Sequence, residues 1–167
     1  MSNIYQTGEY LKATGHTWHS EDSPWKASQI LHIIRHNAIQ PTTVAEVGCG
    51  SGQILVEMSK SEYFKDCQFE GYDISPQAIA LCEKDAKNCN FFCRDIFAGA
   101  SETVGIYDIL LVIDVFEHIP DYMGFVEQCR RKAKYKIYHI PLDIHVSSVL
   151  RNAFIRNRYS IGHIHYF

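Results

Sequence analysis

Residues 43–52 read Thr-Val-Ala-Glu-Val-Gly-Cys-Gly-Ser-Gly, and the chain continues over residues 53–58 as Gln-Ile-Leu-Val-Glu-Met. The short apolar, β-branched run predicts a buried strand, the alternating glycines a tight turn, and the apolar spacing after Gly52 a helix. Glycine at every second position lets a ligand approach the main chain without meeting a Cβ atom. The helix that follows directs its free N–H groups into the same space. The stretch therefore predicts a cofactor-binding turn.

The spacing of the glycines restricts the kind of cofactor. A dinucleotide fingerprint needs glycine at the third residue after Gly50, and this chain has Gln53 there. The pattern is instead an acid, any residue, then Gly-x-Gly-x-Gly, from Glu46 to Gly52. In this respect the chain resembles the class I S-adenosylmethionine-dependent methyltransferases, whose first motif has the same form. The resemblance covers about residues 44–140.

Asp73 closes the second predicted strand, residues 68–73, and lies 21 residues after Gly52. A carboxylate at this point can accept hydrogen bonds from both ribose hydroxyls of a bound nucleoside. The alternative is a surface aspartate that caps the helix opened by Ser75 and Pro76. The glycine motif upstream favours the ribose role.

A third strand is predicted over residues 90–96 and also ends near an acid. By resemblance to the family, Asp95 accepts from the adenine amino group and Ile96 packs on the ring, the alternative for Asp95 being an exposed strand end. The full cofactor site that the resemblance implies is Glu46, Gly48, Gly50, Gly52, Asp73, Ile74, Asp95, Ile96, Ile113 and Asp114.

The substrate side of the site is expected after residues 107–113, a continuous apolar run typical of a central parallel strand. Ligands of open α/β sheets lie outside the carboxyl ends of the strands. Catalysis is therefore assigned to Glu117 and His118; neutral His118 is a candidate general base, and the alternative is a histidine that orients the loop.

The segment Asp114-x-x-Glu117-His118 supports a second hypothesis, a divalent metal site. It resembles segments of ubiquinone-pathway O-methyltransferases and small-RNA 2′-O-methyltransferases, in which a divalent ion lowers the pKa of a substrate hydroxyl. In the RNA enzymes a later histidine completes the site, and His163 is in a comparable place. Methyltransferases without metal also carry this pattern, so the metal stays an open alternative.

At 167 residues and 46% hydrophobic content, the chain is expected to form one globular unit, with an N-terminal cap and helix over 1–40 and the cofactor-binding domain over 41–167. Ser23 is expected to cap the helix and Pro24 to open it. A net charge of −3 gives no drive toward nucleic acid or an anionic membrane. Without a secretory signal or a long apolar run, a soluble cytoplasmic protein is expected. Six cysteines without a C-x-x-C pair indicate reduced thiols.

Strands that alternate with helices predict an α/β, doubly wound, mostly parallel sheet of the Rossmann-like methyltransferase type. The resembled family normally adds a sixth and a seventh strand, and residues 162–167 look like the entry to that missing portion. The fifth strand, near residues 135–140, would then be an open edge that favours a homodimer.

The leading functional hypothesis is methyl transfer from S-adenosylmethionine to an oxygen or nitrogen of a small molecule. A non-catalytic module that binds cofactor or a partner chain is the first alternative. An NAD-dependent oxidoreductase is the second, and Gln53 argues against it.

Overall fold

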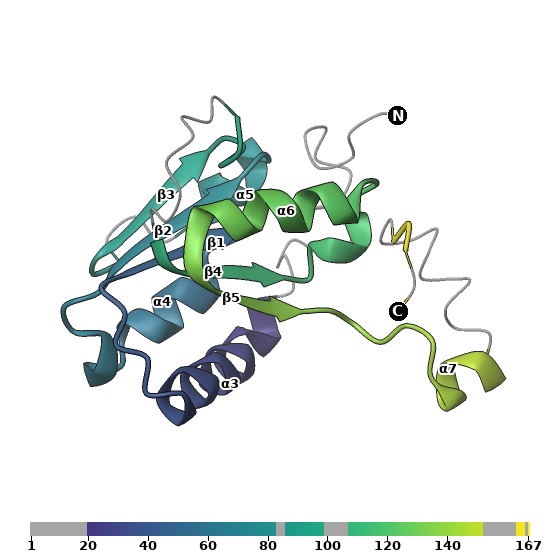
Figure 1. Cartoon of the computed structure of the whole chain (residues 1–167), viewed down its shortest axis with the longest axis horizontal. Helices are drawn as coiled ribbons and strands as arrows, with labels where there is room; N and C mark the ends of the chain where they lie inside the picture. Colours follow the sequence, from purple (N-terminus) through teal and green to yellow (C-terminus); the bar gives the residue numbers. More distant parts are fainter. Residues whose placement is uncertain (1–19, 83–85, 99–106, 152–162, 166) are drawn as a thin grey trace.

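The computed structural model describes residues 20–82, 86–98, 107–151, 163–165 and 167, and these form a sheet with helices on both faces (Figure 1). The described strands are all parallel, in the order β3-β2-β1-β4-β5. Since the order reverses between β1 and β4, a crevice is expected at their carboxyl ends. The strands are β1 (Thr43–Val47), β2 (Gln68–Asp73), β3 (Cys89–Cys93), β4 (Tyr107–Ile113) and β5 (Ala133–His139).

Helices α3 and α4 lie on one face of the sheet and α6 lies on the other (Figure 1). α5 follows β2, and α7 follows β5 at a distance from the sheet (Figure 1). The α-helices are α3 (Ser23–His36), α4 (Gln53–Ser59), α5 (Pro76–Leu81), α6 (Tyr122–Lys132) and α7 (Val146–Leu150), and the short 3-10 helices are η1 (Ser20–Asp22), η2 (Glu62–Phe64) and η3 (Phe116–His118).

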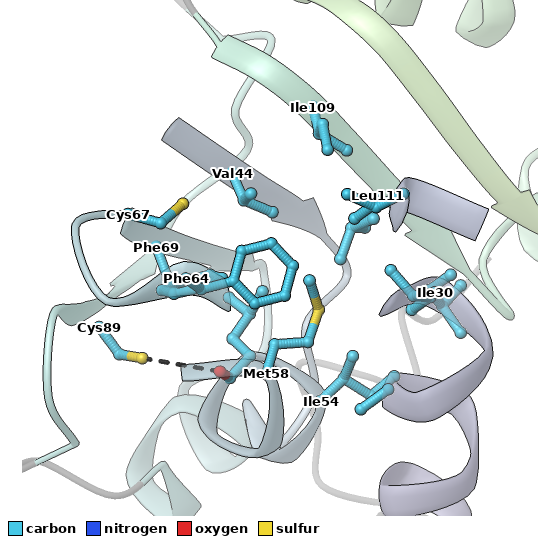
Figure 2. Close-up of a cluster of buried hydrophobic side chains, with 14 residues drawn as sticks. Ile30, Val44, Ile54, Met58, Phe64, Cys67, Phe69, Cys89, Ile109 and Leu111 are labelled. Atoms are coloured by element: carbon cyan, nitrogen blue, oxygen red, sulfur yellow. Dashed lines mark hydrogen bonds between the residues drawn. The ribbon is translucent and has the colours of Figure 1, made fainter. Parts of the chain in front are cut away.

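Alternate residues of the central strands fill two separate cores. Val44 and Ile109 point toward α3 and α4, where Ile30 and Met58 meet them (Figure 2). Leu110 and its neighbours on the opposite face pack under α6. Because both faces of β4 are covered, its residues 109–112 are fully buried, which explains the uninterrupted apolar run in the sequence.

The predicted doubly wound parallel sheet is confirmed, with five strands among the described residues. Three boundaries differ from the prediction, and one of them is that β5 begins at Ala133 and not near residue 135. Ser23 is the first residue of α3 and not its cap, since Asp22 takes the cap position without a side-chain bond. β3 ends at Cys93, so Asp95 and Ile96 lie in the loop after the strand. None of the helices that the structure describes is both long enough and apolar enough to span a bilayer.

Candidate active site

Backbone hydrogen bonds hold the glycine loop after β1 against the end of β2. Gly48 N and Cys49 N donate to Tyr72 O at 2.7 and 3.0 Å. Gly48, Gly50 and Gly52 have φ angles of 66°, 55° and 71°. A side chain at Gly52 would be strained by this φ, and its Cβ would lie 2.3 Å from Phe91 Cε1. The loop therefore requires glycine at position 52, as the motif predicted.

Asp73 lies directly beside this loop. Its Oδ2 accepts from Gly50 N at 3.0 Å, and its Oδ1 accepts from Ser75 N at 2.8 Å. Burial raises the pKa of this carboxyl, and the backbone donors oppose the rise. Ser75, and not Asp73, caps α5, because Ser75 Oγ accepts from Ala78 N. Asp73 thus lies beside the glycine loop, and its ribose role remains a prediction.

Glu46 is the acid of the glycine motif and is 2% exposed. Its Oε2 has no hydrogen-bond partner among the described residues. Burial raises the pKa of Glu46 well above its usual value, although the nearby charge of Lys26 opposes this. A buried acid without a partner is costly unless a ligand satisfies it.

A pocket of about 390 Å³ opens at the carboxyl ends of β1 and β4. Its walls combine part of the predicted cofactor site with both predicted catalytic residues. The predicted residues that line it are Glu46, Gly48, Gly50, Ile113, Asp114, Glu117, His118 and His163.

Other predicted cofactor residues lie outside this pocket wall. Gly52 and Asp73 support the loop, as described above. Asp95 Oδ1 accepts from Phe97 N at 2.8 Å and so makes a local turn. Ile96 packs in the α6 core, and Ile74 is exposed. The adenine-side roles of Ile74, Asp95 and Ile96 remain predictions.

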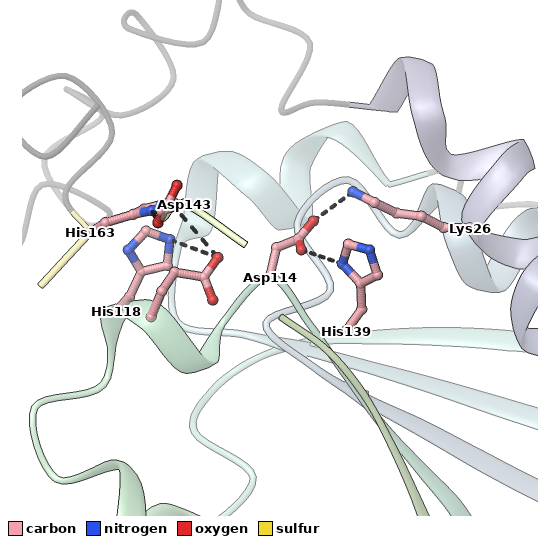
Figure 3. A network of polar contacts seen from close by, with 7 residues as sticks. Lys26, Asp114, His118, His139, Asp143 and His163 are labelled. Atoms are coloured by element: carbon pink, nitrogen blue, oxygen red, sulfur yellow. Dashed lines mark hydrogen bonds and ion pairs between the residues drawn. The ribbon is translucent and has the colours of Figure 1, made fainter. Parts of the chain in front are cut away.

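Asp114 is clamped between two basic side chains from distant elements (Figure 3). Lys26 of α3 donates to Asp114 Oδ2 at 2.5 Å, and His139 Nδ1 of β5 lies 2.6 Å from Asp114 Oδ1. Asp114 has a φ of 53°, a strained region that aspartate tolerates better than most residues. Burial lowers the pKa of Lys26, but its bonds to Asp114 and Asp22 leave that pKa raised.

Glu117, His118 and His163 bring one ligand atom each to within 4.8 Å of one another. Glu117 Oε1 lies 3.9 Å from His118 Nε2 and 3.8 Å from His163 Nε2. Glu117 is 1% exposed, its Oε2 has no partner in the described part of the chain, and burial raises its pKa to about 7. This donor set fits a divalent metal, as the sequence hypothesis proposed.

The cluster differs from that hypothesis in one member. Asp114, the first acid of the Asp114-x-x-Glu117-His118 segment, is not among its ligand atoms, because Lys26 and His139 occupy its carboxylate. His163 reaches the cluster because Ile164 N and His165 N donate to Glu117 O at 3.0 and 3.2 Å.

Sequence reasoning gave no site role to Lys26, His139 and Asp143, which are among the polar residues of the pocket wall. Lys26 is a single base in the first turn of a helix, and His139 is the last residue of a strand. Asp143 lies in the segment between β5 and α7, where its Oδ2 is 2.5 Å from His163 Nδ1. Only His139, at a strand's carboxyl end, carried a sequence signal that could have identified it.

Comparison with known protein families identifies residues 45–135 as a methyltransferase domain. This match spans more than half of the chain. The chain belongs to this methyltransferase family. The resemblance inferred from the glycine motif is therefore confirmed, and the family differs from the NAD-dependent oxidoreductases considered as an alternative.

Two curated relatives of this methyltransferase are ubiquinone biosynthesis O-methyltransferases. The protein of Nitrosospira multiformis is 25% identical over 136 residues, which are 75% of this chain and 55% of the relative. That of Pseudomonas paraeruginosa is 26% identical over 145 residues, 80% of this chain and 61% of the relative. The chain thus spans somewhat more than half the length of these relatives.

Among solved structures, the plantazolicin methyltransferase BpumL, in complex with a monoazolic desmethylPZN analog and SAH, has a similar fold. Its TM-score is 0.59 at 21% identity, covering 93% of this chain and 62% of BpumL. The likeness supports the fold assignment of the five-stranded sheet.

Proposed function

We propose that this methyltransferase domain binds S-adenosylmethionine at the glycine loop and transfers its methyl group to a hydroxyl oxygen of a small molecule. The observation that supports the proposal is that the glycine loop and the cluster of Glu117 and His118 line the same pocket. Gly48, Gly50 and Glu46 line the cofactor side, and Glu117 and His118 line the other. A methyl donor and a hydroxyl acceptor can therefore meet inside one pocket.

The cofactor side has the charges that an amino-acid-bearing nucleoside needs. S-adenosylmethionine carries an ammonium group and a carboxylate, and its sulfonium supplies an already activated methyl group. Glu46, with an unpartnered oxygen, suits the ammonium. Lys26 lines the same wall, but Asp114 and Asp22 already compensate its charge, so it is not assigned to the carboxylate. Asp73, bound to Gly50 N, is assigned to the ribose hydroxyls.

On the acceptor side, Glu117, His118 and His163 are the residues that would hold a divalent ion. Two imidazoles with one carboxylate suit Mn²⁺, Fe²⁺, Co²⁺ or Zn²⁺ better than Mg²⁺, which prefers oxygen ligands. Such an ion would lower the pKa of an acceptor hydroxyl. We assign His118 to ligation in preference to a base role, because its Nε2 lies 3.9 Å from Glu117 Oε1.

The clamp on Asp114 fixes one wall of this pocket. Lys26 and His139 hold the Asp114 carboxylate at the carboxyl end of β4, between the glycine loop and η3. The clamp thereby keeps the charge of Asp114 compensated and ties helix α3 to the pocket wall. Alignment of donor and acceptor is the main contribution that a methyl transfer needs from the protein.

The relatives favour oxygen over nitrogen as the methyl acceptor. Both of these curated relatives carry the name O-methyltransferase. The chain spans only part of the length of these relatives. The test below therefore also distinguishes an enzyme from a module that binds the cofactor without turnover.

The proposal is tested by calorimetric titration with S-adenosylhomocysteine and by an assay for its release from S-adenosylmethionine with catechol and Mn²⁺. We expect wild type to bind the product and Glu46→Gln to bind it about tenfold to 100-fold more weakly, because a charged hydrogen bond is lost. Glu127→Gln, on the exposed face of α6, is the matched control and is expected to bind normally.

Each outcome decides between the alternatives. Absence of binding by wild type contradicts the cofactor site. Binding without turnover over a panel of phenols, catechols and sugar alcohols supports the non-catalytic module. Turnover that does not change on removal of metal with a chelator contradicts the metal-assisted form of the proposal.

A further inference from the structure

A buried aspartate–histidine pair, Asp143 and His163, lies at the proposed metal site, and its role rests on that proposed site. Asp143 and His163 are 8% and 6% exposed, and they come from two separate segments (Figure 3). Asp143 Oδ2 lies 2.5 Å from His163 Nδ1. Because an ionised carboxylate only accepts hydrogen bonds, His163 Nδ1–H is the donor.

This bond determines which nitrogen of His163 is free. With the proton on Nδ1, the lone pair is on Nε2, and Nε2 is the atom that lies 3.8 Å from Glu117 Oε1. Metal-bound histidines commonly donate their other ring N–H to a carboxylate in this way, which fixes both tautomer and ring orientation. The opposite tautomer would direct an N–H at the metal position and prevent ligation.

Asp143 is itself held by the first turn of α7. Ser148 Oγ donates to Asp143 O at 2.6 Å, and His145 N donates to Ser148 Oγ at 3.0 Å. Ile144 N donates to Phe167 O at 3.1 Å, which ties this segment to the residues that follow His163. The backbone at residues 143 and 144 is therefore held from two sides, and the carboxylate itself is held by His163.

We propose that Asp143 is a positioning residue of the metal site: it holds His163 as the Nδ1–H tautomer with Nε2 directed at Glu117 and His118. The carboxylate is not among the clustered ligand atoms of Glu117, His118 and His163, and its Oδ2 is bound to His163. Removal of the carboxylate is expected to weaken metal binding about tenfold to 100-fold, the usual effect of losing such an outer partner.

The first test compares wild type with Asp143→Asn, in which the side-chain amide can donate to Nδ1 and so favours the opposite tautomer. Titration calorimetry with Mn²⁺ and Co²⁺ should show the weaker affinity, and the visible spectrum of the Co²⁺ protein should change. Affinity for S-adenosylhomocysteine and the melting temperature should stay close to wild type. Asp66→Asn, an exposed aspartate before β2, is the matched control.

The second test needs no metal. Long-range ¹H–¹⁵N correlation spectra of the metal-free protein report the tautomer of each histidine, and His163→Ala identifies the relevant signal. We expect the Nδ1–H form in wild type and its loss in Asp143→Asn. A merely structural role would leave this tautomer unchanged.

The outcomes separate this inference from the proposed function. Unchanged metal affinity in Asp143→Asn, or the Nε2–H tautomer in wild type, overturns the role of Asp143 and leaves the metal site in place. Wild type that binds neither Mn²⁺ nor Co²⁺ overturns the metal site and this inference together, without affecting the cofactor site. A variant that melts early is replaced by Ser148→Ala, which should weaken metal binding by a smaller factor.

Discussion

At the scale of single residues, the ionised form of Glu117 is unfavourable in the folded protein. It is almost fully buried, and burial raises its pKa to about 7 from the ordinary 4.5. A carboxyl whose pKa is raised in the folded state binds its proton more tightly there. Its contribution to stability is therefore complete below pH 4.5 and is lost as the pH rises through 7. Residues kept at such a cost commonly have a function.

We predict that Glu117→Gln removes this pH dependence from the metal-free protein. Between pH 5 and pH 8 the free energy of unfolding of wild type should fall by about 2–3 kcal/mol relative to the variant. Urea denaturation at both pH values in the presence of a chelator measures the difference. The control Glu127→Gln should follow wild type, and a constant offset between wild type and Glu117→Gln would contradict the assignment.

At the scale of elements, Asp108 of β4 accepts hydrogen bonds from the residues at the start of β1. Its Oδ2 accepts from Thr42 N at 2.7 Å, from Thr42 Oγ1 at 2.8 Å and from Thr43 N at 3.1 Å. These donors lower the pKa of Asp108, the backbone bond from Thr42 being the largest cause. These bonds lie at the amino ends of β1 and β4, whereas the glycine loop lies at the carboxyl end of β1.

We predict that Asp108→Ala lowers the free energy of unfolding by about 2 kcal/mol, since several charged hydrogen bonds are lost and their backbone donors can still reach water. Affinity for S-adenosylhomocysteine should change less than twofold, because the site is at the other end of β1 and β4. Chemical denaturation and calorimetry measure the two effects. Loss of cofactor affinity at unchanged stability would show that this end of the sheet is coupled to the site.

At the scale of the whole molecule, different hydrogen bonds hold the two sides of the pocket in place. Asp73 and the glycine loop are fixed by β1 and β2. His163 is fixed by Asp143 and by the carbonyl of Glu117. A substitution on one side of the pocket should therefore weaken binding of the ligand on that side and leave binding on the other side unchanged.

We predict opposite binding defects for two variants of these segments. Asp73→Ala should lose affinity for S-adenosylhomocysteine and keep metal affinity, whereas His163→Ala should lose metal affinity more than about 100-fold and keep cofactor affinity. Both should lose turnover, and His36→Ala on the exposed face of α3 should lose none. Separate titrations with metal and with product measure this, and parallel loss of both ligands in either variant would contradict independence.

The sequence by itself determined the sheet, the glycine loop and the place of Asp73, because each depends on local patterns: the apolar run of β1, the alternation in β2, the spacing of the glycines, and the carboxyl end of a strand. It also placed Glu117 and His118 near the site, since they follow β4 directly. It set the end of β3 too late, because only pairing with β2 decides where that strand stops.

Only the tertiary structure decided which polar side chains meet. Lys26 and Asp114 are 88 residues apart, and Asp143 and His163 are 20 apart with α7 between them. No periodicity encodes such pairs, because they form when burial forces each charged group to find a partner across the fold. For the same reason Asp114, which the sequence offered as a metal ligand, is held by Lys26 and His139 instead.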